Sequence, residues 1–240
     1  MNTVKLAVSG CCGRMGQRIT ALALKERIFK ISALLEGQNR PDTPAMMHNV
    51  PISFSNEVIK GSNVLIEFTV PEATIVNLNA CVKYKVNMVI GTTGLTPPQI
   101  AQIKKASKKI AIVFSSNMSV GVNVVFGLIR QASQITGKNY EIRLTETHHI
   151  HKKDAPSGTA KTMAEVAEQH SKIKVKNIES LRKGEVIGDH TITFESDVDL
   201  ISLHHHAKTR DSFAEGSLVA AKFLTKKKKG LFNMQDVLGL

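Results

Sequence analysis

The sequence has no tryptophan, only two tyrosines and only three cysteines among its 240 residues. Two of the cysteines, Cys11 and Cys12, are adjacent, and so small and odd a count argues against a disulfide framework and for reduced thiols. No apolar run approaches the ~20 residues that a membrane span requires. The first residues also lack the apolar core and cleavage site of a signal peptide. We therefore expect a cytoplasmic protein without a membrane partner.

The scarcity of aromatic residues also bears on the formal charge of +12. A positive field attracts nucleic acids, membrane surfaces and multiply charged metabolites alike. No aromatic residues are interleaved with the basic ones, which disfavours a nucleic-acid surface. The run from Lys226 to Lys229 is interpreted as a solvated helix end, where cations suit the helix dipole. We therefore expect a small anionic ligand and no nucleic-acid partner.

The first half of the chain alternates short apolar runs with helical patterns. A helix is predicted from Met15 to Glu26, a second opens at Pro71, and Thr96 caps a third. Strands separated by helices of this length imply parallel pairing and an α/β, doubly wound sheet. A polar segment with two prolines, Asn39 to Asn49, is predicted to be a loop. The predicted strands are Val4 to Ser9, Ile31 to Leu35, Val64 to Phe68, Val86 to Ile90 and Ile110 to Phe114.

The pattern changes after Asn117. A long apolar helix is predicted from Val120 to Ile135 and another helix from about Thr159 to Gln169. Between and after these helices, segments of alternating apolar and polar residues are typical of strands with one solvent-exposed face. They predict an α+β domain built on a partly exposed sheet. These strands are Tyr140 to Thr147, Thr191 to Glu195 and Leu200 to His204. Helical spacing returns from Phe213 to Leu224.

A glycine-rich turn follows the first predicted strand and opens the first helix: Gly10-Cys11-Cys12-Gly13-Arg14-Met15-Gly16. In this context backbone N–H groups and the helix dipole can meet a pyrophosphate. The spacing is GxxGxxG rather than GxGxxG, so the letters alone are a weak signal. The alternative is a glycine turn without a ligand.

Glu36, at the end of the second strand, strengthens the prediction of a dinucleotide site. An acid at this place can accept hydrogen bonds from the adenosine ribose hydroxyls. It favours NAD over NADP, because a 2′-phosphate would face a like charge, although Arg14 and Arg40 could offset this. We expect NADH, NADPH or both to serve as the cofactor.

Two further sets of small residues lie at the carboxyl ends of predicted strands, where a doubly wound sheet binds its ligands. The first combines Phe68-Thr69 with Gly91-Thr92-Thr93, and the second is Ser115-Ser116-Asn117-Met118. Small residues there would let the nicotinamide and its ribose lie against backbone. Ordinary strand-to-helix turns are the alternative for each of them.

The densest group of reactive side chains lies between Glu146 and Ala160. Ser157, Gly158 and Thr159 stand where a loop enters a helix, and unpaired N–H groups there would receive a carboxylate. Lys152 adds a positive charge for the same anion. His148 and His149 can donate a proton or bind an anion near neutral pH.

Three alternatives compete for this segment. Its three histidines could bind zinc, but no cysteine or regular spacing supports a closed site, and His204 to His206 cannot all face one metal because strand side chains alternate. A basic loop could bind phosphate or nucleic acid. Ser157 could be a hydrolase nucleophile, but it lacks the glycine-framed elbow such a serine has. We predict no metal site.

The run from Glu146 to Ala160 resembles the signature segment of dihydrodipicolinate reductases, in which a histidine pair precedes a lysine and the string Asp-Ala-Pro-Ser-Gly-Thr-Ala. The glycine turn at 10–16 is similar to that family's first loop. So are Gly91 to Gly94, Asn117 to Asn123 and the closing Gly230-Leu231-Phe232. The resemblance covers nearly the whole chain, and its middle motif is highly specific.

This resemblance implies a Rossmann-type domain, residues 1–118 and 209–240, that the chain leaves and re-enters. It implies a substrate-binding domain between them, residues 119–208, that also builds a homotetramer through its sheet. The implied reaction is reduction of 4-hydroxy-tetrahydrodipicolinate to tetrahydrodipicolinate by NAD(P)H on the diaminopimelate route to lysine. The substrate is a small dicarboxylate, which suits a basic protein.

By motif position, the resemblance makes His148 the acid that protonates the carbon next to the one receiving hydride. Lys152 matches a residue that assists it and holds a carboxylate, and His149, Gly158 and Thr159 match substrate-binding positions. The cofactor positions are Gly10, Gly13, Arg14, Met15, Glu36, Gly91, Thr93, Ser116 and Met118.

The chain also departs from the family pattern. Cys12 stands where the family commonly has Ala or Gly, Gly37 where NADP-using members can carry Arg, and Met118 where Phe is frequent. Two competing functions stay open. One is an NAD(P)-dependent dehydrogenase acting on another small dicarboxylate, and the other is a basic, NAD-sensing nucleic-acid-binding protein.

Overall fold

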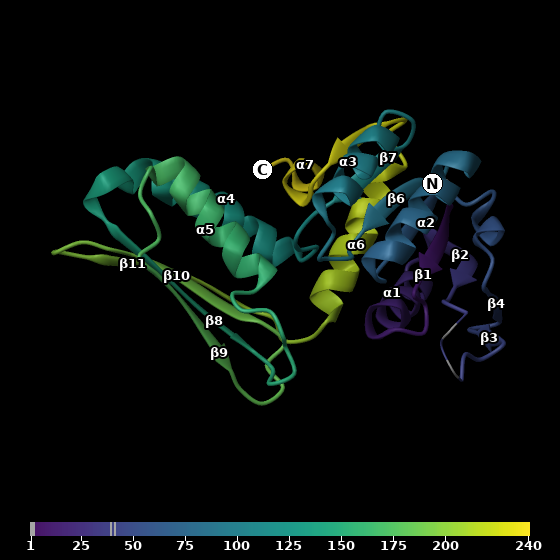
Figure 1. Ribbon diagram of the computed structural model, residues 1–240, viewed down its shortest axis with the longest axis horizontal. Helices are drawn as coiled ribbons and strands as arrows, with labels where there is room; N and C mark the ends of the chain where they lie inside the picture. Colours follow the sequence, from purple (N-terminus) through teal and green to yellow (C-terminus); the bar gives the residue numbers. More distant parts are fainter. Residues whose placement is uncertain (1–2, 39, 41) are drawn as a thin grey trace. The chain divides into compact units, whose positions relative to one another are not determined.

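The computed structural model describes residues 3–38, 40 and 42–240, and it separates into two compact units (Figure 1). The first unit is Met1–Met118 with Phe213–Gly239, and the second is Ser119–Ser212 with Leu240. The loop predicted from Asn39 to Asn49 lies partly outside the described residues. Within its described part, a short β-hairpin replaces the loop's end.

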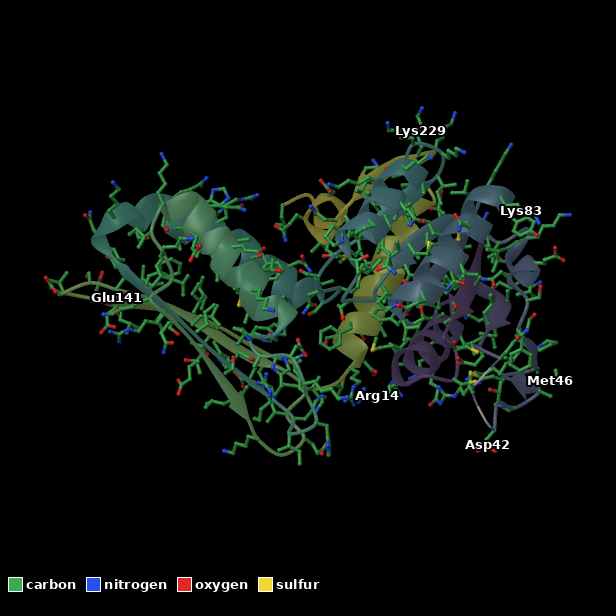
Figure 2. All side chains as sticks on the ribbon, in the orientation of Figure 1. Arg14, Asp42, Met46, Lys83, Glu141 and Lys229 are labelled. Carbon is green, nitrogen blue, oxygen red and sulfur yellow. The ribbon has the colours of Figure 1, made fainter. Side chains whose placement is uncertain are left out.

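The first unit is built on an eight-stranded sheet with the order β12-β7-β6-β5-β1-β2-β4-β3. All neighbours pair in parallel except β3 and β4, which form the antiparallel hairpin at one edge. There Met46 of β3 is exposed (Figure 2). The predicted doubly wound parallel sheet is thus confirmed. The strands are β1 (Val4–Ser9), β2 (Phe29–Leu35), β3 (Met46–Met47), β4 (Val50–Ser53), β5 (Val64–Glu67), β6 (Asn87–Ile90), β7 (Ala111–Phe114) and β12 (Gly230–Phe232).

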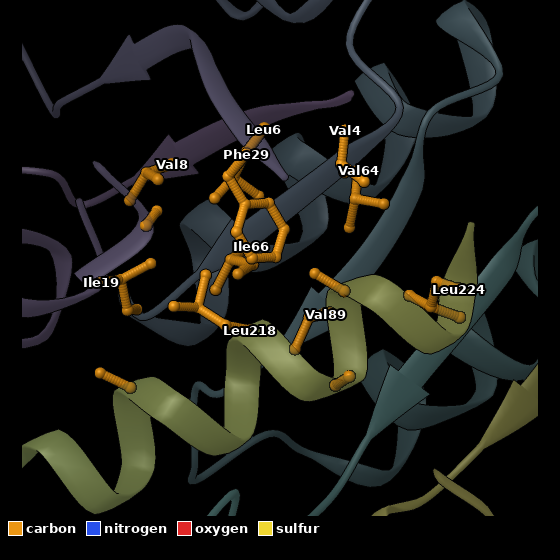
Figure 3. Packing of buried hydrophobic residues seen from close by; sticks show 14 of the residues in the cluster. Val4, Leu6, Val8, Ile19, Phe29, Val64, Ile66, Val89, Leu218 and Leu224 are labelled. Carbon is orange, nitrogen blue, oxygen red and sulfur yellow. The ribbon is translucent and has the colours of Figure 1, made fainter. Parts of the chain in front are cut away.

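Helices cover both faces of this sheet. Ile19 of α1 and Leu218 of α6 pack on one face against strand residues such as Ile66 (Figure 3). Leu78 of α2 and Ile103 of α3 pack in a separate cluster on the other face. The helices are α1 (Arg14–Lys25), α2 (Pro71–Tyr84), α3 (Pro97–Ala106), α6 (Asp211–Leu224), α7 (Met234–Leu238) and the 3₁₀ helix η1 (Asn56–Ile59).

The second unit is a four-stranded mixed sheet with two long helices on one face. Its order is β11-β10-β8-β9, with β8 and β9 parallel and the other pairs antiparallel. Apolar side chains of β8 and β10 are buried under the helices, whereas the opposite face, with Thr145 and Thr193, is partly exposed. The predicted open sheet is therefore confirmed. The elements are α4 (Val120–Thr136), η2 (Gly137–Asn139), β8 (Glu141–His148), α5 (Gly158–Ser171), β9 (Asn177–Arg182), β10 (Asp189–Glu195) and β11 (Leu200–His206).

The lysine run follows the end of α6, in the turn before β12. Lys226, Lys228 and Lys229 are exposed, whereas the ammonium group of Lys227 lies 4.7 Å from the ring centre of Phe223. Cations suit this end of a helix, as expected from the sequence. Among the described residues, no helix has the length and apolar character that crossing a membrane would take.

Helix α1 lies very close to the turn after β1. A Cβ atom added to Gly16 would lie 2.1 Å from the Gly10 carbonyl oxygen, which is backbone and cannot swing aside. We expect Gly16→Ala to lower the free energy of unfolding by about 3 kcal/mol or more, because overpacking moves the backbone. Urea unfolding measures this. Gly37→Ala is the matched control, since its Cβ meets nothing within 4 Å, and an equal loss in both variants would contradict the packing argument.

Candidate functional site

The glycine turn between β1 and α1 is held to the end of β2. The N–H groups of Gly10 and Cys11 donate to the Leu35 carbonyl at 3.0 and 3.1 Å. Gly10 has a φ of 72°, in the left-handed region that favours glycine. Gly13 caps α1, and Arg14 opens it from an exposed position (Figure 2). Because the first N–H groups of a helix have no acceptor within it, this turn can receive an anion.

Glu36 contacts the glycine turn directly. Its Oε2 accepts the Cys12 N–H at 2.8 Å, and its Oε1 accepts the Gly37 N–H at 3.0 Å. The Cys12 carbonyl in turn accepts hydrogen bonds from the Arg40 guanidinium and the Gln17 amide, both at 2.9 Å. Glu36, the acid predicted to bind ribose, therefore lies beside the predicted phosphate site, and the Arg40 guanidinium lies next to that site.

A cavity of about 420 Å³ is lined by predicted cofactor residues that follow β1, β2 and β5. The apolar side chains of Phe54 and Val76 also line the cavity. A concave site with apolar walls and a few polar groups is typical of a small-molecule pocket. The predicted residues that line it are Gly10, Gly13, Glu36, Phe68 and Thr69.

A buried carboxylate ties the loops after β5 and β6 together. Glu67 is fully buried and accepts hydrogen bonds from the hydroxyls of Thr69 at 2.6 Å, Thr92 at 2.8 Å and Thr74 at 3.1 Å. Burial raises the pKa of Glu67, and the three hydroxyls partly oppose this. The Thr92 hydroxyl also accepts the Thr69 N–H at 2.8 Å. The loops after β5 and β6, which the sequence analysis grouped together, thus form one structure, and Glu67, which it left out, organises them.

The other predicted cofactor residues are placed differently. Thr93 and Ser116 are exposed, and the Ser115 hydroxyl donates to the Asn117 carbonyl at 3.0 Å. Gly91 faces the Phe68 ring, where a Cβ would come within 2.3 Å. The side chains of Cys11, Cys12 and Met118 are buried in the core cluster, and Met15 packs against it. These four side chains contribute to the core of the unit.

In the second unit, a carboxylate–imidazole pair lies on the helix-covered face of β8. Glu146 and His148 continue the buried face that Ile142 and Leu144 begin, and Glu146 is fully buried. One carboxylate oxygen of Glu146 contacts Nδ1 of His148. The other accepts a hydrogen bond from Arg182 at 3.1 Å and the Ser157 N–H at 3.3 Å. The strand pattern of period two places both groups on one side of the sheet.

The electrostatics of this pair are set by burial and by neighbouring charges. Burial opposes ionisation of Glu146, but the nearby Ser180 hydroxyl, then the charge of His148 and the hydrogen bonds from Arg182 and His148, outweigh it, and the pKa of Glu146 is lowered. Burial lowers the pKa of His148, and the Glu146 carboxylate only partly offsets this. Because Nδ1 of His148 donates to the carboxylate, Nε2 is the atom left to exchange a proton.

Ser157 caps α5. Its hydroxyl accepts the Ala160 N–H at 3.2 Å and lies 3.1 Å from Nε2 of His190. The His190 ring stands edge-on to His148, with the ring centres 5.0 Å apart. Gly158 and the buried Thr159 form the first turn of α5, where an anion is favoured.

Lys152 is engaged by an acid of its own loop. Its ammonium group lies 2.8 Å from the Asp154 carboxylate, while Arg182 donates to the carbonyls of Lys152 and Asp154. His149 is half-buried, and its ring lies 6.1 Å from that of His151, which is exposed and faces Glu185. Arg182 therefore links the carboxylate of the site to the loop that carries Lys152.

The histidines do not form one group. Glu146, His148 and His190 have ligand atoms within 4.8 Å of one another, but the Arg182 guanidinium occupies the same carboxylate and would repel a cation. His204 and His206 contact Asp189 on the open face of the sheet. His205 lies on the other face, close to Gly121.

Four residues of the two candidate sites were missed by the sequence analysis. Glu146 and Glu67 carried a usable signal, because each is an acid at a position where its strand pattern calls for an apolar side chain. Arg182 and His190 come from β9 and the start of β10, far along the chain, and no spacing connects them to His148.

Comparison with known proteins gives matches along the whole chain. The family model for the N-terminus of dihydrodipicolinate reductase matches residues 4–118, and the model for its C-terminus matches residues 121–238. A 4-hydroxy-tetrahydrodipicolinate reductase from Nitrosospira multiformis is 38% identical, covering 100% of this chain and 99% of the relative. One from Nitrosomonas europaea is 37% identical, covering 100% of both chains.

A similar fold is found among solved structures. A dipicolinate-bound dihydrodipicolinate reductase from Paenisporosarcina sp. TG-14 superposes with a TM-score of 0.82 at 22% identity, covering 98% of each chain. The aspartate dehydrogenase of Thermotoga maritima gives a TM-score of 0.54 at 11% identity, covering 92% of this chain and 96% of that one. The architecture is therefore shared more widely than the sequence.

The buried His190 predicts a pH-dependent stability. Burial, and next the charge of His148, lower its pKa from 6.5 to about 4. The unfolded chain takes up this proton first, so the stabilisation is complete above pH 6.5 and is lost as the pH falls toward 4. We expect a loss of about 3 kcal/mol across this window from His190 alone. Urea unfolding of wild type and His190→Gln measures it, and equal slopes in the two proteins would contradict the assignment.

Proposed function

The chain belongs to the dihydrodipicolinate reductase family, and we propose from this how its two units divide the reaction between them. The protein is an NAD(P)H-dependent oxidoreductase that reduces 4-hydroxy-tetrahydrodipicolinate to tetrahydrodipicolinate on the diaminopimelate route to lysine. The observation that best supports a chemical role for this chain's own residues is the buried Glu146–His148 pair beside the N-terminus of α5.

In this proposal the first unit holds the dinucleotide, which supplies the hydride when it is bound. The residues that line the cavity fit such a ligand, because Gly10 and Gly13 expose backbone at the start of α1 and Glu36 offers acceptors for ribose hydroxyls. Glu67 fixes Thr69 and Thr92 for the nicotinamide end. Glu36 followed by Gly37 favours NADH, while Arg14 and Arg40 allow some use of NADPH.

The second unit binds the dicarboxylate. One carboxylate is received by the N–H groups of Gly158 and Thr159 at the positive end of α5, and His149 is a further anion ligand. Lys152 holds a carboxylate by exchanging its partner Asp154 for the ligand. The formal charge of +12 speeds the capture of both anionic ligands.

His148 is the proposed acid. Glu146 accepts the Nδ1 proton, which orients the ring, stabilises the imidazolium form and leaves the Nε2 proton for the ring carbon next to the one reduced. Burial lowers the pKa of His148 in the protein alone. The negative charges of a bound dicarboxylate would raise that pKa again, so His148 becomes charged when the substrate is present.

The open face of the second sheet is the proposed surface of a homotetramer. It carries threonines and exposed apolar side chains, among them Leu181 and Leu200 with 44% and 55% of their surface exposed. Such a face favours self-association. We also propose that the enzyme works in the cytoplasm, as a reducing compartment suits three free cysteines.

His148→Gln tests the acid role. We expect kcat to fall by about 10²-fold or more with little change in the KM for NADH, because proton donation is lost while the first unit is untouched. Gly13→Val is the contrasting variant and should raise the KM for NADH, since even a Cβ there lies 3.1 Å from the Gly10 carbonyl. Steady-state kinetics with both ligands varied measures this. Turnover by His148→Gln at the wild-type rate would sink the assignment.

Thr193→Glu tests the assembly. Thr193 lies on the open face in the middle of β10, between Arg143 of β8 and Ser202 of β11. If two such sheets pack face to face, a charge at this position would be buried in their interface. We expect sedimentation velocity to show dissociation of the tetramer. Lys161→Glu, on exposed α5 surface, is the control and should keep the wild-type mass. A Thr193→Glu protein that stays tetrameric would place the interface elsewhere.

A further inference from the structure

The glycine turn places two thiols, which the reductase reaction does not use, beside the carboxylate of Glu36. The ligand atoms of Cys11, Cys12 and Glu36 all lie within 4.8 Å of one another. The two sulfur atoms are 3.9 Å apart. In a tetrahedral zinc–thiolate site with Zn–S bonds of ~2.3 Å, two sulfurs lie about 3.8 Å apart. The sulfur pair thus already has the spacing that a bound zinc ion would impose.

The backbone holds this cluster in place. The Cys11 N–H donates to the Leu35 carbonyl, and the Cys12 N–H donates to Glu36 itself. The Cys12 carbonyl is fixed by Arg40 and Gln17. Each Glu36 oxygen accepts one backbone N–H and keeps a further lone pair. The ligands therefore need little rearrangement, and a preformed site binds more tightly than a mobile one.

The charges select a particular class of cation. Two thiolates and one carboxylate carry three negative charges, a divalent cation balances two of them, and the neighbouring Arg40 balances the third. Sulfur ligands favour thiophilic metals such as zinc over magnesium or calcium, which prefer oxygen. Without a metal, burial raises the pKa of the Cys11 thiol to about 12, so binding must release the thiol protons to solvent.

We propose that Cys11, Cys12 and Glu36 form a site for a thiophilic divalent cation of the zinc type, and that cation and dinucleotide exclude each other. The exclusion follows from shared groups. Glu36 lines the cavity with Gly10 and Gly13, so a cation on its carboxylate removes the acceptor meant for ribose. This second part rests on the proposed place of the cofactor, whereas the metal site itself does not. A fourth coordination position is left for water.

Titration of the intact protein with Co²⁺ under anaerobic, reducing conditions tests the site. Cobalt replaces zinc in thiolate sites and gives visible bands that report tetrahedral sulfur ligation. We expect one Co²⁺ per chain in wild type and at least about tenfold weaker binding in Cys12→Ala, because one of only two thiolates is lost. Cys81→Ala is the matched control, since that third cysteine is fully buried in the cluster on the opposite face of the sheet. Thermal unfolding verifies that each variant is folded.

Two outcomes would overturn the site. One is the absence of thiolate bands in wild type, and the other is equal Co²⁺ affinity in wild type and Cys12→Ala. Either outcome counts against the metal site whether or not the enzyme reduces its substrate. A band that forms while the protein fails to turn over would instead count against the proposed function and leave the site standing.

Competition with NADH tests the exclusion. Added NADH should bleach the cobalt bands, and Zn²⁺ should inhibit the wild-type reductase competitively with NADH but not with the dicarboxylate. The Zn²⁺ concentration for half-inhibition, measured against each protein's own uninhibited rate, should rise at least about tenfold in Cys12→Ala and stay unchanged in Cys81→Ala. Bands that persist in saturating NADH would show that the two ligands bind side by side and would overturn the exclusion.

Discussion

The cost of burying a carboxylate organises both units of this protein. A buried charge without partners costs several kcal/mol, so a buried carboxylate needs hydrogen-bond donors, and these can come from segments that are distant in the sequence. Glu67 gathers three threonine hydroxyls and thereby joins the loops after β5 and β6. Glu146 gathers His148, Arg182 and the cap of α5. Glu67 is the last residue of β5 and Glu146 lies near the end of β8, and each links segments that are separate in the chain.

The same constraint links structure to chemistry in the second unit. A carboxylate that only stabilised the fold could be replaced by an apolar side chain of similar size, often without loss. Here it also orients an imidazole and anchors, through Arg182, the loop that carries Lys152. Positioning of the proton donor and of the anion-binding loop therefore depends on one buried group. In the first unit, Glu36 has a comparable place but is half-buried, and its exposure leaves it available to ligands.

Sequence patterns predicted the regular parts of the fold and the local part of the site. The apolar runs at β1, β2 and β5 to β7 and the alternation in β8 and β10 indicated the two sheet types. Burial on both faces leaves a continuous apolar run, whereas burial on one face leaves an alternation. β9 was missed because its apolar residues, Ile178 and Leu181, are three apart rather than two. The edge strands β3 and β12 are too short to show any period. Arg182 and His190 join His148 only through strand pairing, which a linear pattern does not encode.

The interrupted layout of the first unit has a consequence for synthesis. Its sheet lacks the edge strand β12, and one face lacks the cover of α6, until the final segment Phe213–Gly239 has left the ribosome. The second unit is continuous from Ser119 to Ser212 and is complete earlier. Domains generally fold as units as they emerge from the ribosome. The nascent chain therefore carries a folded second unit while Ile66 and Val89 of the first unit still lack Leu218, the α6 residue that packs in the same cluster. Truncation at the C-terminus would therefore expose the interior of the part of the protein that is made first.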